Sequence, residues 1–145
     1  MSEQLHRQQW LCFQLGSETY AQQVEQVREI LDYTTPVPIP GAPNCVEGVL
    51  NVRGEIVTIV SGHLMLSLPS KQQPCAHIVV LETHNGLVGI SVGEVQQISW
   101  LRPENMMPIE RREAGSPVWG TIEHVEQLLI LTDFERSINE LDSYE

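Results

Sequence analysis

Two apolar runs in the first half of the chain predict β-strands. Residues 10–15 read Trp-Leu-Cys-Phe-Gln-Leu, and residues 56–60 are all β-branched, a composition that strands favour. The polar turn Asn-Val-Arg-Gly precedes the second run. Gly54 readily adopts the positive φ of a sharp reversal, and Asn51 tolerates turn geometry nearly as well. The pattern therefore predicts a hairpin that presents Arg53 at its tip, where its guanidinium suits a carboxylate or a row of carbonyls.

Between these two runs the apolar spacing changes. Val24, Val27 and Leu31 fall on one face of a helix. We therefore expect a helical stretch here, with Glu29 pointing off the apolar face toward solvent. The prolines of residues 36–43 exclude regular structure and predict a fixed, extended connection.

Strand signals return after a polar bridge at residues 67–74. Asn85 followed by Gly86, between two apolar runs, is a strong signal for a β-hairpin. A long loop at residues 103–117 interrupts the series. The predicted strands of this part of the chain are residues 76–83, 87–92, 95–101, 118–123 and 127–131.

The last periodic segment predicts a helix. Thr132 followed by Glu135 has the spacing of a capping box, in which the two side chains satisfy free backbone N–H groups at the start of a helix. Phe134, Ile138 and Leu141 then share one helical face, which we expect to pack against the strands.

Many short strands with few helices predict an all-β barrel or sandwich. The 145 residues suit a single domain. We expect an ordered core over about residues 10–141, after a polar N-terminal tail at residues 1–9. Two strand-rich halves, joined near residue 70, are each too small for a good core and gain most by packing against one another.

The net charge of −11, from 19 acids and 8 bases, narrows the range of partners. A nucleic-acid binder needs a basic surface, and the sequence encodes none, so we expect no nucleic-acid partner. No apolar run is long enough to span a bilayer, and the polar N-terminus does not read as a secretory signal. Cys12, Cys45 and Cys75 are widely spaced, which suits free thiols in a reducing compartment. We therefore expect a cytoplasmic protein.

The sequence nominates no catalytic or cofactor-binding group. It lacks a glycine-rich phosphate loop and a closely spaced Cys or His pair for zinc. His77 and His124 lie on predicted strands and fit structural roles, and a Cys–His nucleophile pair needs partners that meet only in space. We therefore expect no enzyme, no metal and no cofactor. The histidines are scattered, at His6, His63, His77, His84 and His124.

The hairpin at residues 48–57, Gly-Val-x-Asn-x-Arg-Gly-x-Ile-Val, resembles the signature of CheW-like domains, the coupling proteins of bacterial chemosensory arrays. Other elements similar to that family follow the same order. They are an opening hairpin at residues 11–20, a Val-x-Glu-Ile element at residues 27–30 and a closing strand at residues 128–133. The resemblance extends over nearly the whole chain, from about residue 11 to residue 141.

This resemblance implies an all-β fold of two intertwined, small, five-stranded SH3-like barrels that share a hydrophobic seam. It also implies a noncatalytic adaptor that couples the cytoplasmic tip of methyl-accepting chemoreceptors to the regulatory domain of a CheA-type histidine kinase. Such an adaptor is recruited to membrane-associated receptor arrays, where it has the opportunity to self-associate. Asn51 and Gly54 then shape the turn. The receptor-binding residues that carry over are Val27, Glu29, Arg53, Val95 and Ile98.

Taken alone, the same residues fit simpler roles: Arg53 fits an ion pair within its own domain, and Glu29 fits a solvated acid. Two departures from the family pattern stand out. Ser61 replaces the family's Asp after the hairpin, and the Val-Asp-Gly-Val pattern of the second barrel reads Val-Gly-Glu-Val at residues 92–95. Because of these departures, a second interpretation is that the chain is a specialised coupling protein of a type IV pilus (twitching) pathway. An alternative from another class is a small-ligand binder or enzyme that uses the cleft between the barrels.

Overall fold

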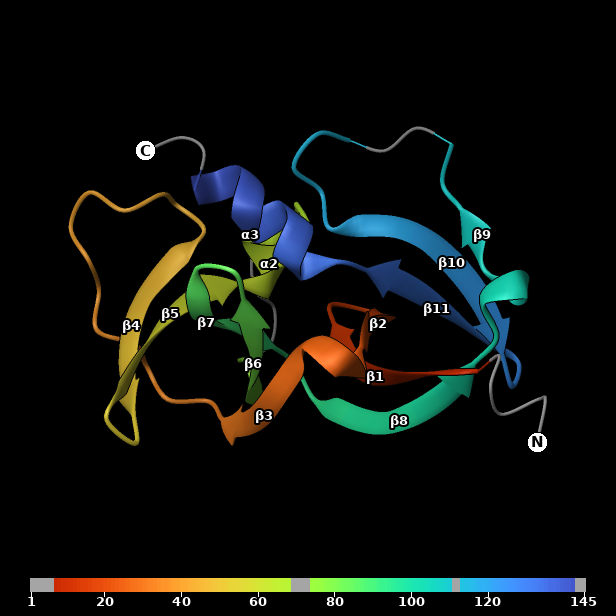
Figure 1. The fold of residues 1–145 in the computed structure, drawn as a ribbon, viewed down its shortest axis with the longest axis horizontal. Coiled ribbons are helices and arrows are strands. Elements are labelled where there is room, and N and C mark those ends of the chain that lie inside the picture. Colours follow the sequence, from red (N-terminus) through yellow and green to blue (C-terminus); the bar gives the residue numbers. More distant parts are fainter. Residues whose placement is uncertain (1–6, 69–73, 111–112, 143–145) are drawn as a thin grey trace.

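Two sheets make up most of the computed structural model, which describes residues 7–68, 74–110 and 113–142 (Figure 1). The first sheet has six strands in the order β8 (Val95–Leu101), β1 (Gln8–Leu15), β2 (Glu18–Gln23), β11 (Gln127–Thr132), β10 (Val118–His124) and β9 (Met107–Pro108). The second has five, in the order β3 (Val27–Asp32), β6 (His77–Thr83), β7 (Gly86–Val92), β5 (Glu55–Ser61) and β4 (Val46–Val52). The helical segments are η1 (Val24–Gln26), α2 (Gly62–Met65), η2 (Pro103–Asn105) and α3 (Phe134–Asp142).

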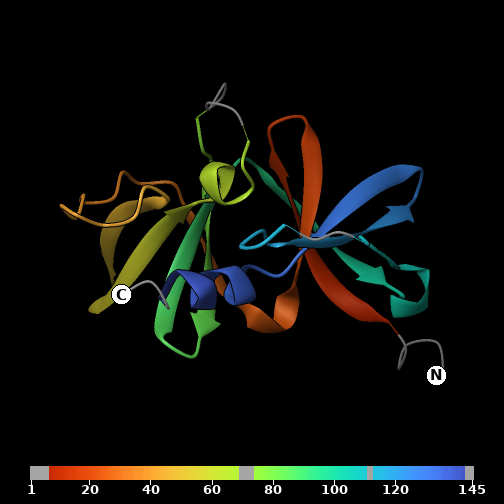
Figure 2. The ribbon, with the colours of Figure 1, turned by 90° about the horizontal axis from the view of Figure 1, so that it is seen from above.

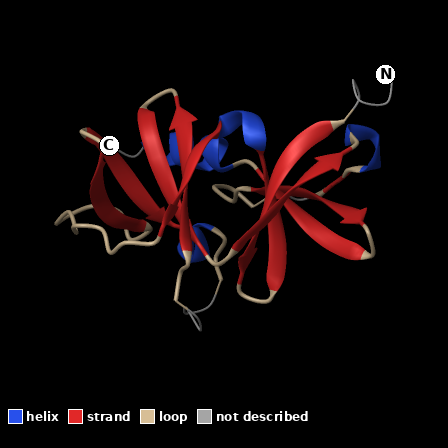
Figure 3. Cartoon of the chain, turned by 90° about the horizontal axis from the view of Figure 1, so that it is seen from below, coloured by secondary structure: helices blue, strands red, loops and turns tan. Residues whose placement is uncertain are grey.

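The two sheets are not successive halves of the chain. Strand β2 pairs in parallel with β11, so that Ala21 lies opposite Leu131, whereas strands β3 to β7 form the five-stranded sheet. The expected division near residue 70 is therefore wrong, because β5 and β7, on either side of it, are neighbours in one sheet. Figure 3 shows the two groups of strands as adjoining lobes. The prediction of an all-β fold of two intertwined small barrels that share a hydrophobic seam is confirmed, and β9 adds a sixth strand to one of the expected five-stranded units.

The main hydrophobic core lies in the seam between the two sheets. Phe13 comes from the six-stranded sheet, Leu81 and Ile90 come from the five-stranded sheet, and all three are buried. The ring centroid of Phe13 lies 6.2 Å from that of Tyr20 and 6.2 Å from that of Phe134. Helix α3, which carries Phe134, leaves the end of β11 and runs beside the five-stranded sheet (Figures 1 and 2). The helix therefore joins the two lobes at the seam.

Strand β1 is apolar on both faces because each face meets a core. Leu11 and Phe13 pack in the seam, while Trp10 and Cys12 belong to a second cluster inside the six-stranded sheet. Strand β6 alternates in the same way between the seam and a third cluster inside the five-stranded sheet. Strands that are buried on both faces read as continuous apolar runs, without the polar alternation of a half-exposed strand.

The helix expected around residues 24–31 is wrong. Val24–Gln26 forms a short 3-10 helix, and the chain then extends as β3, which pairs antiparallel with β6. Along β3 the side chains of Val27, Glu29 and Leu31 are partly buried and those between them are exposed. Glu29 therefore lies on the same side as the apolar residues, with 23% of its side chain exposed, and does not point off that face. Three apolar residues fit a helical period, but pairing with the buried strand β6 decides the outcome.

The helix expected near the C-terminal end is confirmed as α3, but its capping box is wrong. Asp133 precedes the helix, and its Oδ1 accepts a hydrogen bond from the backbone N–H of Arg136 at 3.3 Å. The Thr132 hydroxyl instead donates to a backbone carbonyl of β2 at 2.9 Å. The apolar face predicted for the helix is buried at Phe134 and Ile138.

The hairpin expected at Asn85 joins β6 to β7, and its last pair is Thr83 with Gly86. The other strands predicted after the polar bridge are present, with β9 and η2 inside the predicted long loop. Residues 1–6 of the polar tail, which include His6, residues 69–73 of the polar bridge and the side chain of Leu141 lie outside the described part of the chain.

Two glycines of the β4–β5 hairpin offer a matched test of this fold. Gly48 lies at a bulge with a φ of +149°, where a Cβ atom would stand 2.1 Å from the carbonyl oxygen of Val37. Gly54 has a φ of +86° but open space at the Cβ position. We expect Gly48→Ala to lower the free energy of unfolding by about 2–4 kcal/mol and Gly54→Ala by about 1 kcal/mol. Equal losses in urea denaturation would show that the crowding at Gly48 is relieved without a penalty.

Candidate functional site

The tip of the β4–β5 hairpin is a two-residue turn made of Arg53 and Gly54. Val52 pairs with Glu55, and the φ angles of Arg53 and Gly54 are +52° and +86°. Positive φ at both central positions is typical of the type I′ turns that join tightly twisted strands. The Oδ1 atom of Asn51 accepts a hydrogen bond from the backbone N–H of Gly54 at 2.9 Å. Arg53 thus occupies a left-handed position that Asn and Gly usually fill.

Arg53 forms an ion pair with Glu29, through its Nη2 atom and the Oε1 atom of the carboxylate. Strands β3 and β4, which carry Glu29 and lead to Arg53, are the two opposite edges of the five-stranded sheet. The ion pair therefore shows that the sheet curls until its edges approach each other. In Figure 1 the hairpin tip and β3 lie on the same lower side of this lobe. The hydrogen bond and charge of Glu29 raise the pKa of Arg53 above its ordinary value.

A second ion pair joins β3 to the hairpin, with the positions of the two charges exchanged: here the arginine is on β3 and the acid is at the hairpin. Arg28 bonds the Oε1 atom of Glu55 at 3.3 Å through Nη2 and that of Glu82 at 3.2 Å through Nη1. Along β3 a positive residue, Arg28, is thus followed by a negative one, Glu29. Each meets a residue of opposite charge at the hairpin tip, Glu55 and Arg53 respectively. We call Arg28, Glu29, Arg53 and Glu55 the charge clasp. Exposed ion pairs contribute about 0–1 kcal/mol each, so the clasp orients side chains more than it stabilises the fold.

The curled sheet is also fastened at Tyr33, which follows β3. Its hydroxyl donates a hydrogen bond of 2.7 Å to the Oε1 atom of Glu47 on β4, and the other oxygen of Glu47 accepts a bond from Ser91. Burial, followed by the hydrogen bond and charge of Glu47, raises the pKa of the Tyr33 hydroxyl. The hydroxyl therefore stays protonated and keeps donating to Glu47.

The apolar residues expected at the site lie in two different surroundings. Val27 and Val95 are partly buried and pack against the seam core. The backbone N–H of Val95 donates to Nδ1 of His77 at 3.2 Å, which ties the start of β8 to β6. Ile98 stands apart from them, on the outer side of β8, and is 50% exposed. The structure thus brings Val27 and Val95 to one core and leaves Ile98 as an open apolar side chain.

Sequence reasoning missed two members of the charge clasp. No motif in the sequence singles out Arg28 or Glu55. The Arg-Glu pair in β3 and the Arg-Gly-Glu segment at the hairpin nevertheless carry complementary charges. Sequence reasoning also missed α2. Ser61, which stands where the family pattern has Asp, ends β5 and caps this helix, because its Oγ accepts a hydrogen bond from the backbone N–H of Leu64 at 3.2 Å.

Other chemistry is sparse in the part of the chain that the structure describes. No group of three or more His, Cys, Asp or Glu side chains among residues 7–68, 74–110 and 113–142 is arranged to hold a metal ion. Within the same ranges, every helix is too short or too polar to cross a membrane. Cys12, Cys45 and Cys75 form no disulfide among the described residues, and burial raises the pKa of Cys12 and of Cys45.

Comparison with known proteins gives a consistent result. Residues 9–142 match the CheW-like domain family. The chain is 30% identical to the chemotaxis protein CheW of Klebsiella aerogenes, over 91% of this chain and 82% of that protein. It is 27% identical to the CheW of Rhizobium meliloti over 68% of this chain, but it spans only 64% of that protein's length. The crystal structure of the scaffolding protein TtCheW from Thermoanaerobacter tengcongensis is 18% identical and superimposes with a TM-score of 0.81, covering 90% of this chain and 92% of the other.

We expect Arg53→Asn to leave the free energy of unfolding close to that of the wild type, because relief at the left-handed position offsets the loss of an exposed ion pair. Arg28→Asn is the matched control. Arg28 has no positive φ to relieve and makes two ion pairs, so its replacement should only destabilise. Urea denaturation measures both. A larger loss for Arg53→Asn than for Arg28→Asn would mean that Arg53 holds the fold together.

Proposed function

This chain belongs to the CheW-like domain family, and we propose that it is a noncatalytic adaptor that couples chemoreceptors to a CheA-type histidine kinase. The named relatives are chemotaxis proteins, and the similar solved structure is described as a scaffolding protein. The observation that carries the proposal is the geometry of Arg53. A long cationic side chain, 71% exposed, stands at a backbone position that Asn or Gly occupies with less strain. Strained residues persist where the side chain is needed for function.

In this proposal the receptor tip binds the face formed by Val27, Glu29, Arg53, Val95 and Ile98. The carboxylate of Glu29 holds one nitrogen of the Arg53 guanidinium. The remaining N–H groups of the planar fork are then directed for carboxylates or carbonyls of the receptor, so less side-chain entropy is lost on binding. Ile98, on β8, supplies a separate exposed apolar contact.

The kinase regulatory domain binds elsewhere, at strand ends of the two lobes, so one chain can hold both partners at once. Individual interfaces of this kind are modest in area, and repetition in an array raises the overall affinity. The adaptor is thus cytoplasmic and gathers at membrane-associated receptor arrays. Capture of partners from the native cytoplasm, with their identification, tests this class. A receptor recovered together with the kinase supports it, and the identity of the receptor distinguishes a flagellar from a type IV pilus pathway.

We expect Arg53→Asn to weaken binding to a purified receptor tip by at least about tenfold and to leave binding to the purified kinase regulatory domain unchanged. Arg53→Lys retains the charge but loses the planar guanidinium. Its affinity for the receptor tip should therefore lie between those of the wild type and the Asn variant. Titration of each partner separately, for example by calorimetry, gives these values. The assignment of Arg53 fails if the Asn variant binds the receptor tip as tightly as the wild type.

Glu29→Lys tests the other half of the pair. It places a like charge against Arg53 and frees the guanidinium from its support, so receptor binding should weaken while kinase binding is retained. Glu82→Lys is a suitable control, because Glu82 belongs to β6 and contacts Arg28 rather than Arg53. Equal loss of affinity for receptor and kinase in Glu29→Lys would show that the two surfaces overlap.

A further inference from the structure

The six-stranded sheet encloses a core of its own, and this core opens into a cavity at one end. The cavity has a volume of about 360 Å³, within the range of small-ligand sites, which often lie in the mouths of barrels. Trp10 belongs to the buried core, and Trp119 and Met106 pack against it partly buried. The apolar part of the wall consists of Trp10, Pro103, Met106, Pro108 and Trp119.

Trp10 is part of this wall and is itself buried. The residue is only 3% exposed, and its Nε1 atom is buried with no hydrogen-bond partner among the described residues. Buried polar groups are nearly always paired, and an exception calls for a reason. The Trp10 and Trp119 rings lie 6.2 Å apart at 47° and form an aromatic corner. The Nε1 atom itself is shielded from the cavity, so the corner offers a ligand its aromatic rings rather than this N–H group.

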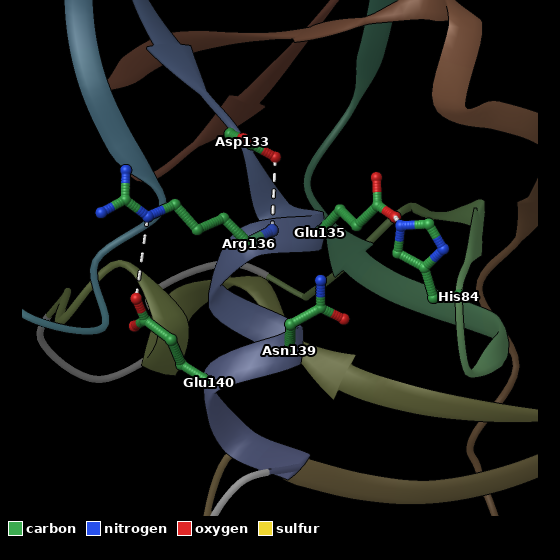
Figure 4. Close-up of a pocket in the computed structure, with 6 residues that line it drawn as sticks. All are labelled: His84, Asp133, Glu135, Arg136, Asn139 and Glu140. Carbon is green, nitrogen blue, oxygen red and sulfur yellow. Dashed lines mark hydrogen bonds and ion pairs between the residues drawn. The ribbon is translucent and has the colours of Figure 1, made fainter.

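The polar part of the wall is held in place before any ligand arrives. Gln22 is buried, accepts from the backbone N–H of Phe134 at 3.2 Å and donates to the side chain of Gln26 at 2.6 Å. Gln26 in turn donates to Glu135 at 3.0 Å. Glu135 ends this series of contacts, and its Oε1 atom lies 3.7 Å from Nε2 of His84. Figure 4 shows these two side chains pointing toward each other. The carboxamides are therefore fixed rather than free to rotate.

The electrostatics of the cavity favour a cation. Its lining contains the carboxylate of Asp133 and no Lys, Arg or His, and the whole chain carries a net charge of −11. One oxygen of Asp133 accepts from the backbone N–H of Arg136, and the carboxylate retains a second oxygen. Indole faces attract cations, guanidinium groups especially. An anionic ligand finds no charged partner here.

We propose that this cavity binds an arginine side chain presented by a partner peptide, with the guanidinium between the Trp10–Trp119 corner and Asp133. The planar guanidinium stacks on aromatic rings and pairs with carboxylates, and both kinds of partner line this one cavity. The site is separate from the charge clasp and does not depend on the adaptor role.

The test uses N-acetyl-arginine methylamide as the probe and records the indole N–H signals of the three tryptophans by NMR in the full chain. The matched probe is the citrulline analogue, which has the same shape and no charge. Trp100, 49% exposed and absent from the cavity lining, serves as the internal reference. We expect a saturable shift of the Trp10 and Trp119 signals, a constant Trp100 signal, and an affinity for the citrulline probe at least about tenfold lower, or about 1.4 kcal/mol.

Two variants complete the experiment. Asp133→Asn removes the charge but keeps a residue that caps helices well, and it should weaken the arginine probe about fivefold or more. Glu123→Gln removes an exposed carboxylate of β10 outside the cavity and should leave the affinity unchanged. The proposal is overturned if the Trp10 signal shows no saturable shift or if the citrulline probe binds equally well. It is also overturned if both variants weaken binding alike, because the attraction then comes from overall charge.

Discussion

Packing in the seam is the interaction on which the rest of this structure depends. Phe13 lies there among Tyr20, Phe134 and the buried residues of the five-stranded sheet. Neither sheet has another surface of that size to bury, so each lobe is completed by its neighbour. The same constraint explains why β1 and β6 are apolar on both faces.

The charge clasp follows from the curl of the five-stranded sheet. A flat five-stranded sheet would hold β3 and β4 far apart, whereas here Glu29 and Arg53 touch across the two edges. Arg28 and Glu55 repeat the contact with the signs reversed. Such exposed pairs contribute little free energy. Their effect is to fix the direction in which the Arg53 fork faces, and direction is what a partner surface can recognise.

Local patterns predicted the strands and hairpins well, because turn chemistry and β-branched runs act over a few residues. The Asn-Val-Arg-Gly turn and the Asn85–Gly86 hairpin are examples. The prediction failed at β3, where Val24, Val27 and Leu31 suit a helix by spacing alone and only the presence of β6 decides otherwise. The family signature pointed to Glu29 and Arg53, but no local rule shows that they touch. Their ion pair arises from the curl of the whole sheet.

The parallel pairing of β2 with β11 also bears on how the chain folds as it is synthesised. The Thr132 hydroxyl bonds the carbonyl of Ala21, 111 residues earlier, while β3 to β7 find all their neighbours among themselves. The middle lobe can therefore pair its strands on the ribosome before β8 to β11 have emerged. The early hairpin of β1 and β2 must wait with both edges open, because its neighbours β8 and β11 are made later. Contacts of such long sequence separation form slowly and leave strand edges exposed in the meantime. The strands made first are the last to be enclosed.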